Sequence, residues 1–208
     1  MLDMKDDGVV TIKADIVEAL RTRGITPEAP LVRLHETSNI WSDRRTLVVK
    51  ASWSKSTRQN YLFDLKAFTD AGVRCEEPLV DEVIPVGEMH AVVVRYLMPD
   101  RPPRASDAES VGALLRTVHE ATLDPDMYEP PRDGCVNFPD DWLAQNIIIY
   151  GGVPYLVDLD LWQEWRRDEA VKVACAEFLR DLQHTDDDVA AFHRGYGIWR
   201  SAKAGLAQ

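Results

Sequence analysis

The sequence has few cysteines, no long apolar run and little positive charge. Its three cysteines, Cys75, Cys135 and Cys175, are odd in number and form no Cys-x-x-Cys pair, which argues against a disulfide framework or a zinc site. Apolar stretches such as 91–94 and 147–150 are far shorter than the ~20 residues that a membrane helix needs. The first residues contain neither the basic region nor the apolar core of a secretory signal. We therefore expect a reduced, soluble, cytoplasmic protein that has no membrane partner.

The deficit of positive charge limits the classes of ligand. The chain has 24 Lys and Arg against 35 Asp and Glu, a formal net charge of −11 at pH 7. Such an acidic balance argues against a nucleic-acid partner or binding to an anionic membrane surface. It leaves open a small site in which a few cations and a metal ion hold an anionic ligand. With 208 residues, of which 45% are hydrophobic, the chain can bury a genuine core as one domain or two small lobes.

Hydrophobic periodicity divides the chain into a β-rich first half and a helix-rich second half, which predicts an α+β fold. In the first half it predicts strands over 31–41, 46–52, 78–86 and 91–98, and helices over 12–23 and 56–71. The proline-dense segment 99–104 separates the halves. In the second half it predicts helices over 106–121, 168–182 and 186–199, the first capped by Ser106, and a hairpin over 147–159 that turns at Gly151-Gly152.

Polar residues around this hairpin have the chemistry that phosphoryl transfer needs. That reaction requires a carboxylate at the nucleophile, oxygen ligands for Mg²⁺ and a cation on the phosphates. Asp141 lies in a loop, Asn146 enters a strand five residues later, and Asp158 ends the paired strand. Because the two glycines fold one strand back on the other, Asn146 and Asp158 are expected at the same end of the ladder. Lys50, which we expect at the end of a strand, supplies the cation.

This pattern resembles that of the aminoglycoside phosphotransferase and choline kinase family, which has a protein-kinase-like fold. In the catalytic loop of that family an Asn follows an Asp five residues later, as Asn146 follows Asp141 here. About a dozen residues later that family has an apolar residue followed by an Asp, as in Val157-Asp158. The likeness extends over about 31–196. It includes an "LL–LH" helix at 111–119, a link at Ala71–Val73 with Pro78, and an "F–GYG" helix at 192–197.

The resemblance implies a two-lobed fold. Residues 1–97 would form a small antiparallel β-sheet lobe, and residues 98–208 a mainly helical lobe with an embedded β-hairpin. It implies that Asp141 is the catalytic base and that Asn146 and Asp158 hold Mg²⁺. Asp160 shares the strand face of Asp158, which leaves two readings open, a ligand of a second metal ion or a cap of the following helix.

The resemblance also implies that the first lobe binds ATP or GTP. Lys50 would hold the α- and β-phosphates, oriented by Asp64 from the following helix. Ser38 and Asn39, in a hairpin that lacks glycine, would cover the phosphates with side-chain hydrogen bonds.

The expected reaction is transfer of the γ-phosphate to a hydroxyl of a small-molecule acceptor. Leu97 and Met98, where the lobes join, would present backbone groups to the adenine. An acidic chain suits a cationic acceptor such as an aminoglycoside. Pro139-Asp140 stands where the family has His-Gly. Two alternatives remain: a compact Ser/Thr protein kinase that acts on a partner protein, and a pseudokinase that binds nucleotide without turnover.

Overall fold

The computed structural model describes residues 4–34, 38–121, 131–139, 142, 144–158 and 162–197, without the side chains of 4–11, 137–139, 162 and 163. The chain forms two compact units. The first consists of Met1–Ala67 and Glu76–Met98, and the second of Phe68–Cys75 and Pro99–Gln208. The segment 68–75 therefore belongs with the second unit, whereas the sequence placed a single boundary between residues 97 and 98.

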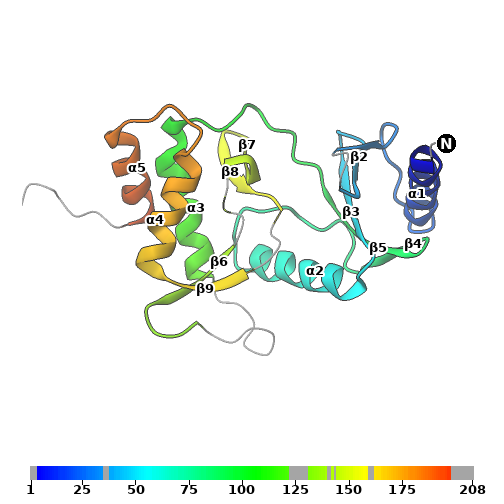
Figure 1. Cartoon of the computed structure of the whole chain (residues 1–208), viewed down its shortest axis with the longest axis horizontal. Helices are drawn as coiled ribbons and strands as arrows, with labels where there is room; N and C mark the ends of the chain where they lie inside the picture. The colour runs from blue at the N-terminus through cyan, green and yellow to red at the C-terminus, as the bar shows by residue number, and fades with distance from the viewer. Residues whose placement is uncertain are drawn as a thin grey trace, which may run out of the picture. The chain divides into compact units, whose positions relative to one another are not determined.

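The first unit is built on a five-stranded antiparallel sheet with the strand order β1-β2-β3-β5-β4 (Figure 1). Its valine-rich central strands, β3 and β5, pair from Leu47 opposite Arg95 to Ser52 opposite His90. The strands are β1 Val32–Arg33, β2 Ile40–Ser42, β3 Leu47–Ser52, β4 Ile84–Val86 and β5 Met89–Arg95.

Two helices pack on this sheet, α1 (Met4–Arg21) and α2 (Lys55–Asp70). Leu47 and Val49 belong to the hydrophobic core to which α1 contributes Ile16 and Leu20. Because side chains alternate along a strand, Lys50 points to the opposite face. There it contacts Tyr61 of α2, and Figure 1 shows the two helices on different sides of β3 and β5.

A buried carboxylate organises the turn between β2 and β3. Asp43 accepts hydrogen bonds of 2.6–3.0 Å from the backbone N–H groups of Arg45, Thr46 and Leu47 and from the Thr46 hydroxyl. Burial alone would raise the pKa of Asp43, but the hydrogen bonds outweigh it and hold this pKa well below its ordinary value. The turn includes Arg44 at a φ of 55°, and it sets the register in which Lys50 lies opposite Ile40.

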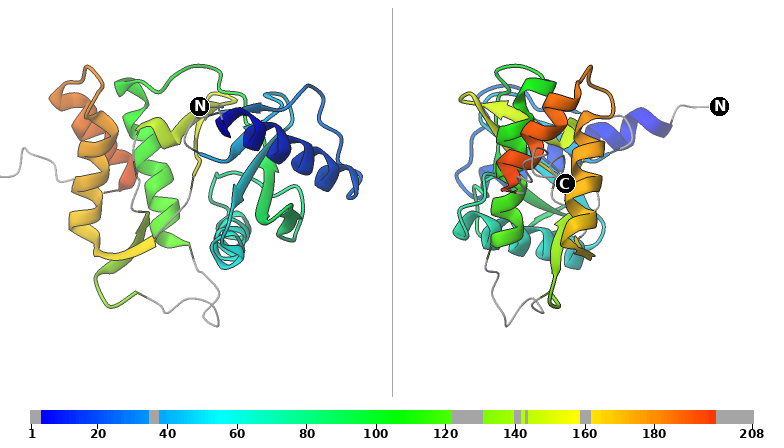
Figure 2. Two further views of the ribbon diagram at one scale, coloured as in Figure 1. Left: turned by 45° about the vertical axis from the view of Figure 1, so that its right-hand side comes forward. Right: turned by 90° about the vertical axis from the view of Figure 1, so that its left-hand side faces the viewer.

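In its described part the second unit is mainly helical, and three helices pack side by side there (Figure 2). They are α3 Ala108–Glu120, α4 Arg167–Leu179 and α5 Asp186–Tyr196, with short 3₁₀ turns η1 Ala105–Asp107 and η2 Ala144–Asn146. None of the helices in the described part of the chain combines the length and apolar character needed to span a bilayer.

Two antiparallel strand pairs accompany these helices. The expected hairpin is confirmed: β7 (Ile147–Tyr150) pairs with β8 (Val153–Leu156), and Gly151 and Gly152 turn at φ values of 60° and 78°. The second pair, β6 (Cys135–Pro139) with β9 (Trp162–Arg166), was not predicted. The α+β, two-lobed fold class is confirmed.

The backbones of α3 and α5 approach each other closely at two glycines. A Cβ atom on Gly112 would overlap the carbonyl oxygen of Phe192, and one on Gly195 would overlap the carbonyl oxygen of Glu109. At one end of the pair, the Tyr196 hydroxyl lies 2.8 Å from His119 Nδ1. The "LL–LH" motif at 111–119 and the "F–GYG" motif at 192–197 therefore contribute residues to the contact between α3 and α5.

Candidate functional site

The first unit contains a buried cluster of polar groups around Lys50. Lys50 Nζ donates to Glu76 Oε2 at 2.7 Å and to the Tyr61 hydroxyl at 2.7 Å. The Tyr61 hydroxyl also makes a short hydrogen bond to Glu76 Oε2. Lys50, Tyr61 and Glu76 are 4%, 2% and 5% exposed. A charge this deeply buried is stable only when it is paired and hydrogen-bonded, and here both conditions hold.

The structure corrects two expectations about Lys50. It is the fourth residue of the six-residue strand β3, not the last residue of a strand. The carboxylate placed against its ammonium group is Glu76, whereas the sequence nominated Asp64. Glu76 lies in the segment after α2, 26 positions from Lys50, and Tyr61 of α2 is also hydrogen-bonded to the lysine.

Ser38 and Asn39, the residues expected to cover the phosphates, are hydrogen-bonded to Arg33 of β1. Arg33 Nε donates to the Ser38 carbonyl at 2.7 Å, and its Nη2 donates to Asn39 Oδ1 at 3.2 Å. The Ser38 hydroxyl oxygen is buried and has no hydrogen-bond partner among the described residues. The phosphate-covering role of Ser38 and Asn39 stays a prediction.

Leu97 and Met98, the two residues that we expect to contact the adenine, follow β5 after Tyr96, and Met98 is the last residue of the first unit. Leu97 is buried and Met98 is 66% exposed. The role of their backbone groups as the adenine contact stays a prediction.

In the second unit, the open end of the β7–β8 hairpin brings two expected metal ligands together along the backbone. The N–H of Val157 donates to the carbonyl of Asn146 at 2.8 Å, one step beyond the pair formed by Ile147 and Leu156. Asp158 follows at once, with a φ of 61°. Non-glycine residues rarely adopt this left-handed conformation, and it is enriched at functional sites.

Asn146 and Asp158 offer an amide oxygen and a carboxylate oxygen, the hard donors that Mg²⁺ prefers. No group of three or more His, Cys, Asp or Glu residues within the described ranges is arranged to hold a metal ion. Mg²⁺ is usually held by one or two carboxylates together with water and substrate phosphates. The catalytic candidate Asp141 and the candidate ligand Asp160 lie outside the described residues.

His119 is a poor candidate for a general base. It is buried at the end of α3, and burial, assisted by the positive charge of Arg167, lowers its pKa to about 3. Arg167 donates to the Tyr196 oxygen at 3.3 Å, so the Tyr196 proton is available to His119 Nδ1. With so low a pKa the imidazole is neutral near neutral pH, and its contact with Tyr196 links α3 to α5.

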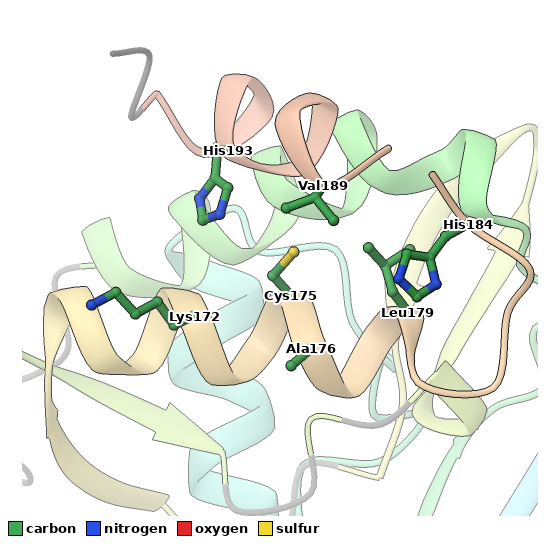
Figure 3. Close-up of a pocket in the computed structure, with 7 residues that line it drawn as sticks. All are labelled: Lys172, Cys175, Ala176, Leu179, His184, Val189 and His193. Carbon is green, nitrogen blue, oxygen red and sulfur yellow. The ribbon is translucent and has the colours of Figure 1, made fainter. Parts of the chain in front are cut away.

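A groove of about 350 Å³ lies between α4 and α5. Figure 3 shows Cys175 pointing from α4 toward Val189 of α5, with His193 on the same side. Burial raises the pKa of the Cys175 thiol to about 11. The thiol is therefore protonated near neutral pH, which suits a packing role rather than a nucleophile.

The sequence matches no protein-family model and no curated protein sequence. Solved structures do match. One is a spectinomycin phosphotransferase in complex with ADP and spectinomycin, with a TM-score of 0.69 and 11% identity over 90% of this chain and 80% of that chain. Another is an aminoglycoside-3′-phosphotransferase of type VIII, with a TM-score of 0.61 and 17% identity over 89% and 91%. The chain has the fold of the aminoglycoside phosphotransferases.

The same fold likeness extends to a choline kinase from Streptococcus pneumoniae. That structure has a TM-score of 0.62 and 15% identity, over 89% of this chain and 80% of the kinase. Because the match covers 89% of this chain, it includes residues of both units.

Proposed function

We propose that the chain is a Mg²⁺-dependent phosphotransferase that moves the γ-phosphate of ATP or GTP to a hydroxyl of a small-molecule acceptor. The observation that carries the proposal is the open end of the β7–β8 hairpin. There the left-handed backbone of Asp158 follows the hydrogen bond between Val157 and Asn146. Solved structures of this fold include complexes with AMP, ADP and ATP, and with spectinomycin, gentamicin or streptomycin.

Each residue then has a separate part in the reaction. Lys50, held by Glu76, binds the phosphates of the nucleotide with its ammonium group. Asn146 and Asp158 hold Mg²⁺, which when bound neutralises charge on the phosphates. Asp141 orients the acceptor hydroxyl and takes its proton. A cytoplasmic location and a cationic acceptor complete the proposal, the latter because the chain carries a net charge of −11.

The decisive experiment compares the wild-type chain with Asp141→Asn. Both are incubated with labelled ATP, Mg²⁺ and a panel of aminoglycosides, amino alcohols and sugars. We expect Asp141→Asn to lower turnover by about 10²-fold or more, the usual scale of general-base catalysis, and to leave nucleotide binding nearly intact. Near-normal turnover in the variant would remove Asp141 from the mechanism.

A pseudokinase is the second candidate, favoured by the glycine-free hairpin before β3 and by Pro139-Asp140 in place of His-Gly. The same experiment separates it from the enzyme. A pseudokinase binds Mg²⁺ and ATP in calorimetry, yet it labels neither a small acceptor nor a protein of a cell lysate. Labelling of lysate proteins alone would instead indicate the third reading, a compact Ser/Thr protein kinase.

A further inference from the structure

The Tyr61 hydroxyl is the group in the Lys50 cluster that the proposed reaction has not used. It lies on α2, it is buried, and it contacts both members of the ion pair. We propose that Tyr61 is a positioning residue, which aims the Lys50 ammonium group at the phosphates of the nucleotide. This inference rests on the proposed function and adds to it a residue through which α2 acts on the site.

The direction of the hydrogen bonds in this cluster follows from the chemistry of the three groups. An ammonium group only donates and a carboxylate only accepts, whereas a phenolic hydroxyl does both. Tyr61 therefore accepts from Lys50 and donates to Glu76, while Lys50 also donates to Glu76 at 2.7 Å. The three bonds close a ring. In an ion pair alone, the ammonium group can move around the carboxylate. The closed set of three hydrogen bonds instead fixes the directions of two of the three N–H bonds of Lys50.

Packing alone does not require this hydroxyl. A phenylalanine ring would fill the same volume between the sheet and α2, but it would leave a buried ammonium and a buried carboxylate each short of one partner. Such a loss is costly in an interior of low dielectric constant. The ring of Tyr61 is also held from its own helix, because the guanidinium carbon of Arg58 lies 5.3 Å from the ring centroid, one turn earlier.

The test is a double-mutant cycle on nucleotide binding, which requires no knowledge of the acceptor. Calorimetry with ATP and Mg²⁺ is carried out on the wild-type chain, Lys50→Ala, Tyr61→Phe and the double variant. We expect Tyr61→Phe to weaken binding about tenfold, the scale of one hydrogen bond to a charged group. In the Lys50→Ala background, Tyr61→Phe should change binding by less than about twofold, because the residue acts through Lys50.

Tyr150→Phe is the matched control. Tyr150 lies on β7 at the glycine turn, away from the Asn146 end, and is 39% exposed. Its loss of a hydroxyl should leave binding within about twofold of wild type. The inference is overturned if Tyr61→Phe binds like Tyr150→Phe, or if it weakens binding equally with and without Lys50, which is the behaviour of a merely structural residue.

A second variant decides the question if Tyr61→Phe does not fold. Glu76→Gln removes the charge of the carboxylate and keeps the Tyr61 hydroxyl against Lys50. We expect it to bind ATP more tightly than Lys50→Ala does, by about threefold or more, since Tyr61 still holds the ammonium group. Equal losses in Glu76→Gln and Lys50→Ala would show that the carboxylate alone places the lysine.

Failure of the inference and failure of the proposed function give different results. If Lys50→Ala binds ATP as the wild type does, or if the wild type does not bind, the proposed function fails first. If Lys50→Ala weakens binding and Tyr61→Phe does not, the nucleotide role of Lys50 stands and only the positioning role of Tyr61 is wrong.

Discussion

Asp158 combines a charged side chain with a backbone conformation that costs free energy. Its φ of 61° places it in the left-handed region, which is unfavourable by roughly 1–2 kcal/mol for a residue with a Cβ atom. Glycine occupies the same region without that cost and is common at turns. Aspartate tolerates this region better than most residues with a Cβ atom do, and the proposed metal site would use its carboxylate.

A pair of substitutions separates the carboxylate from the backbone. Asp158→Ala and Asp158→Gly both remove the carboxylate, so nucleotide binding should become equal in Mg²⁺ and in EDTA for both variants. Asp158→Gly should be more stable to urea than Asp158→Ala by about 1 kcal/mol, since only glycine is relaxed at this φ. Both variants retaining the Mg²⁺ dependence of the wild type would exclude Asp158 from the metal site.

His119 makes the stability of the second unit sensitive to acid. Its pKa falls from 6.5 to about 3 on folding, mainly through burial. Between these pH values the unfolded chain binds a proton at this site that the folded chain does not. The contribution of His119 is therefore complete above pH 6.5 and is lost as the pH falls toward 3.

We expect the free energy of unfolding to fall below pH 6.5 more steeply in the wild type than in His119→Asn. The asparagine amide can replace Nδ1 opposite Tyr196 but does not titrate. The difference between the two proteins should approach, at most, about 1.4 kcal/mol per pH unit, measured by urea unfolding. Parallel pH profiles would mean that the imidazole is already accessible to protons in the folded chain.

Sequence reasoning can bring together candidate residues that are linked by short spacings, and it misses contacts between residues that are far apart in the chain. Asn146 and Asp158 flank one tight hairpin, so the glycine turn sufficed to bring them together along the backbone. Glu76 has no such local signal, because it reaches Lys50 from the segment after α2. Glu76 follows Val73-Arg74-Cys75 and precedes Glu77, so neither helix nor strand periodicity singles it out.

At the scale of elements, the α3–α5 pair shows why small residues matter in the second unit. Gly112 and Gly195 let the two backbones approach until a Cβ atom at either position would overlap a carbonyl oxygen of the other helix. Phe192 of α5 is fully buried, and its ring centroid lies 6.4 Å from that of Phe178 on α4. The glycines are thus required by the distance between the helices and not by a turn.

Gly195→Ala should destabilise the chain by about 3 kcal/mol or more, because it forces apart a contact that includes backbone atoms. Gly24→Ala is the control. Gly24 has a φ of 70° and open space around its would-be Cβ, so its substitution should cost only about 1–2 kcal/mol for the left-handed conformation. Equal losses in thermal unfolding would show that α3 and α5 relax apart without penalty.

Element boundaries were predicted less well than element types. The helix expected from Ser106 begins as the 3₁₀ turn η1, and Asp107, not Ser106, occupies the N-cap position of α3, without a side-chain cap hydrogen bond. Its carboxylate instead accepts from the N–H of Arg104 and pairs with Arg101 at 2.6 Å. The strand expected over 78–86 is regular only at Ile84–Val86. Pro78 forms a single bridge to Val94. A proline lacks the N–H that a regular ladder needs.

At the scale of the whole molecule, the net charge of −11 acts on any charged acceptor. The field of many carboxylates raises the local concentration of cations near the surface, and added salt screens it, with a Debye length of about 8 Å at physiological ionic strength. In the proposed reaction the nucleotide is anionic, and Lys50 and Mg²⁺ would hold it against this field. A cationic acceptor is helped by it.

The KM for a cationic aminoglycoside should therefore rise severalfold when the salt concentration increases from about 50 to about 300 mM. The KM for an uncharged sugar acceptor should stay nearly constant over the same range. Steady-state kinetics with labelled ATP measures both, and saturating nucleotide keeps the effect of salt on nucleotide binding out of the comparison. A KM that does not change with salt for an accepted aminoglycoside would mean that local contacts alone select the acceptor. An enzyme that uses only uncharged acceptors would show that its acidic surface serves no role in substrate choice.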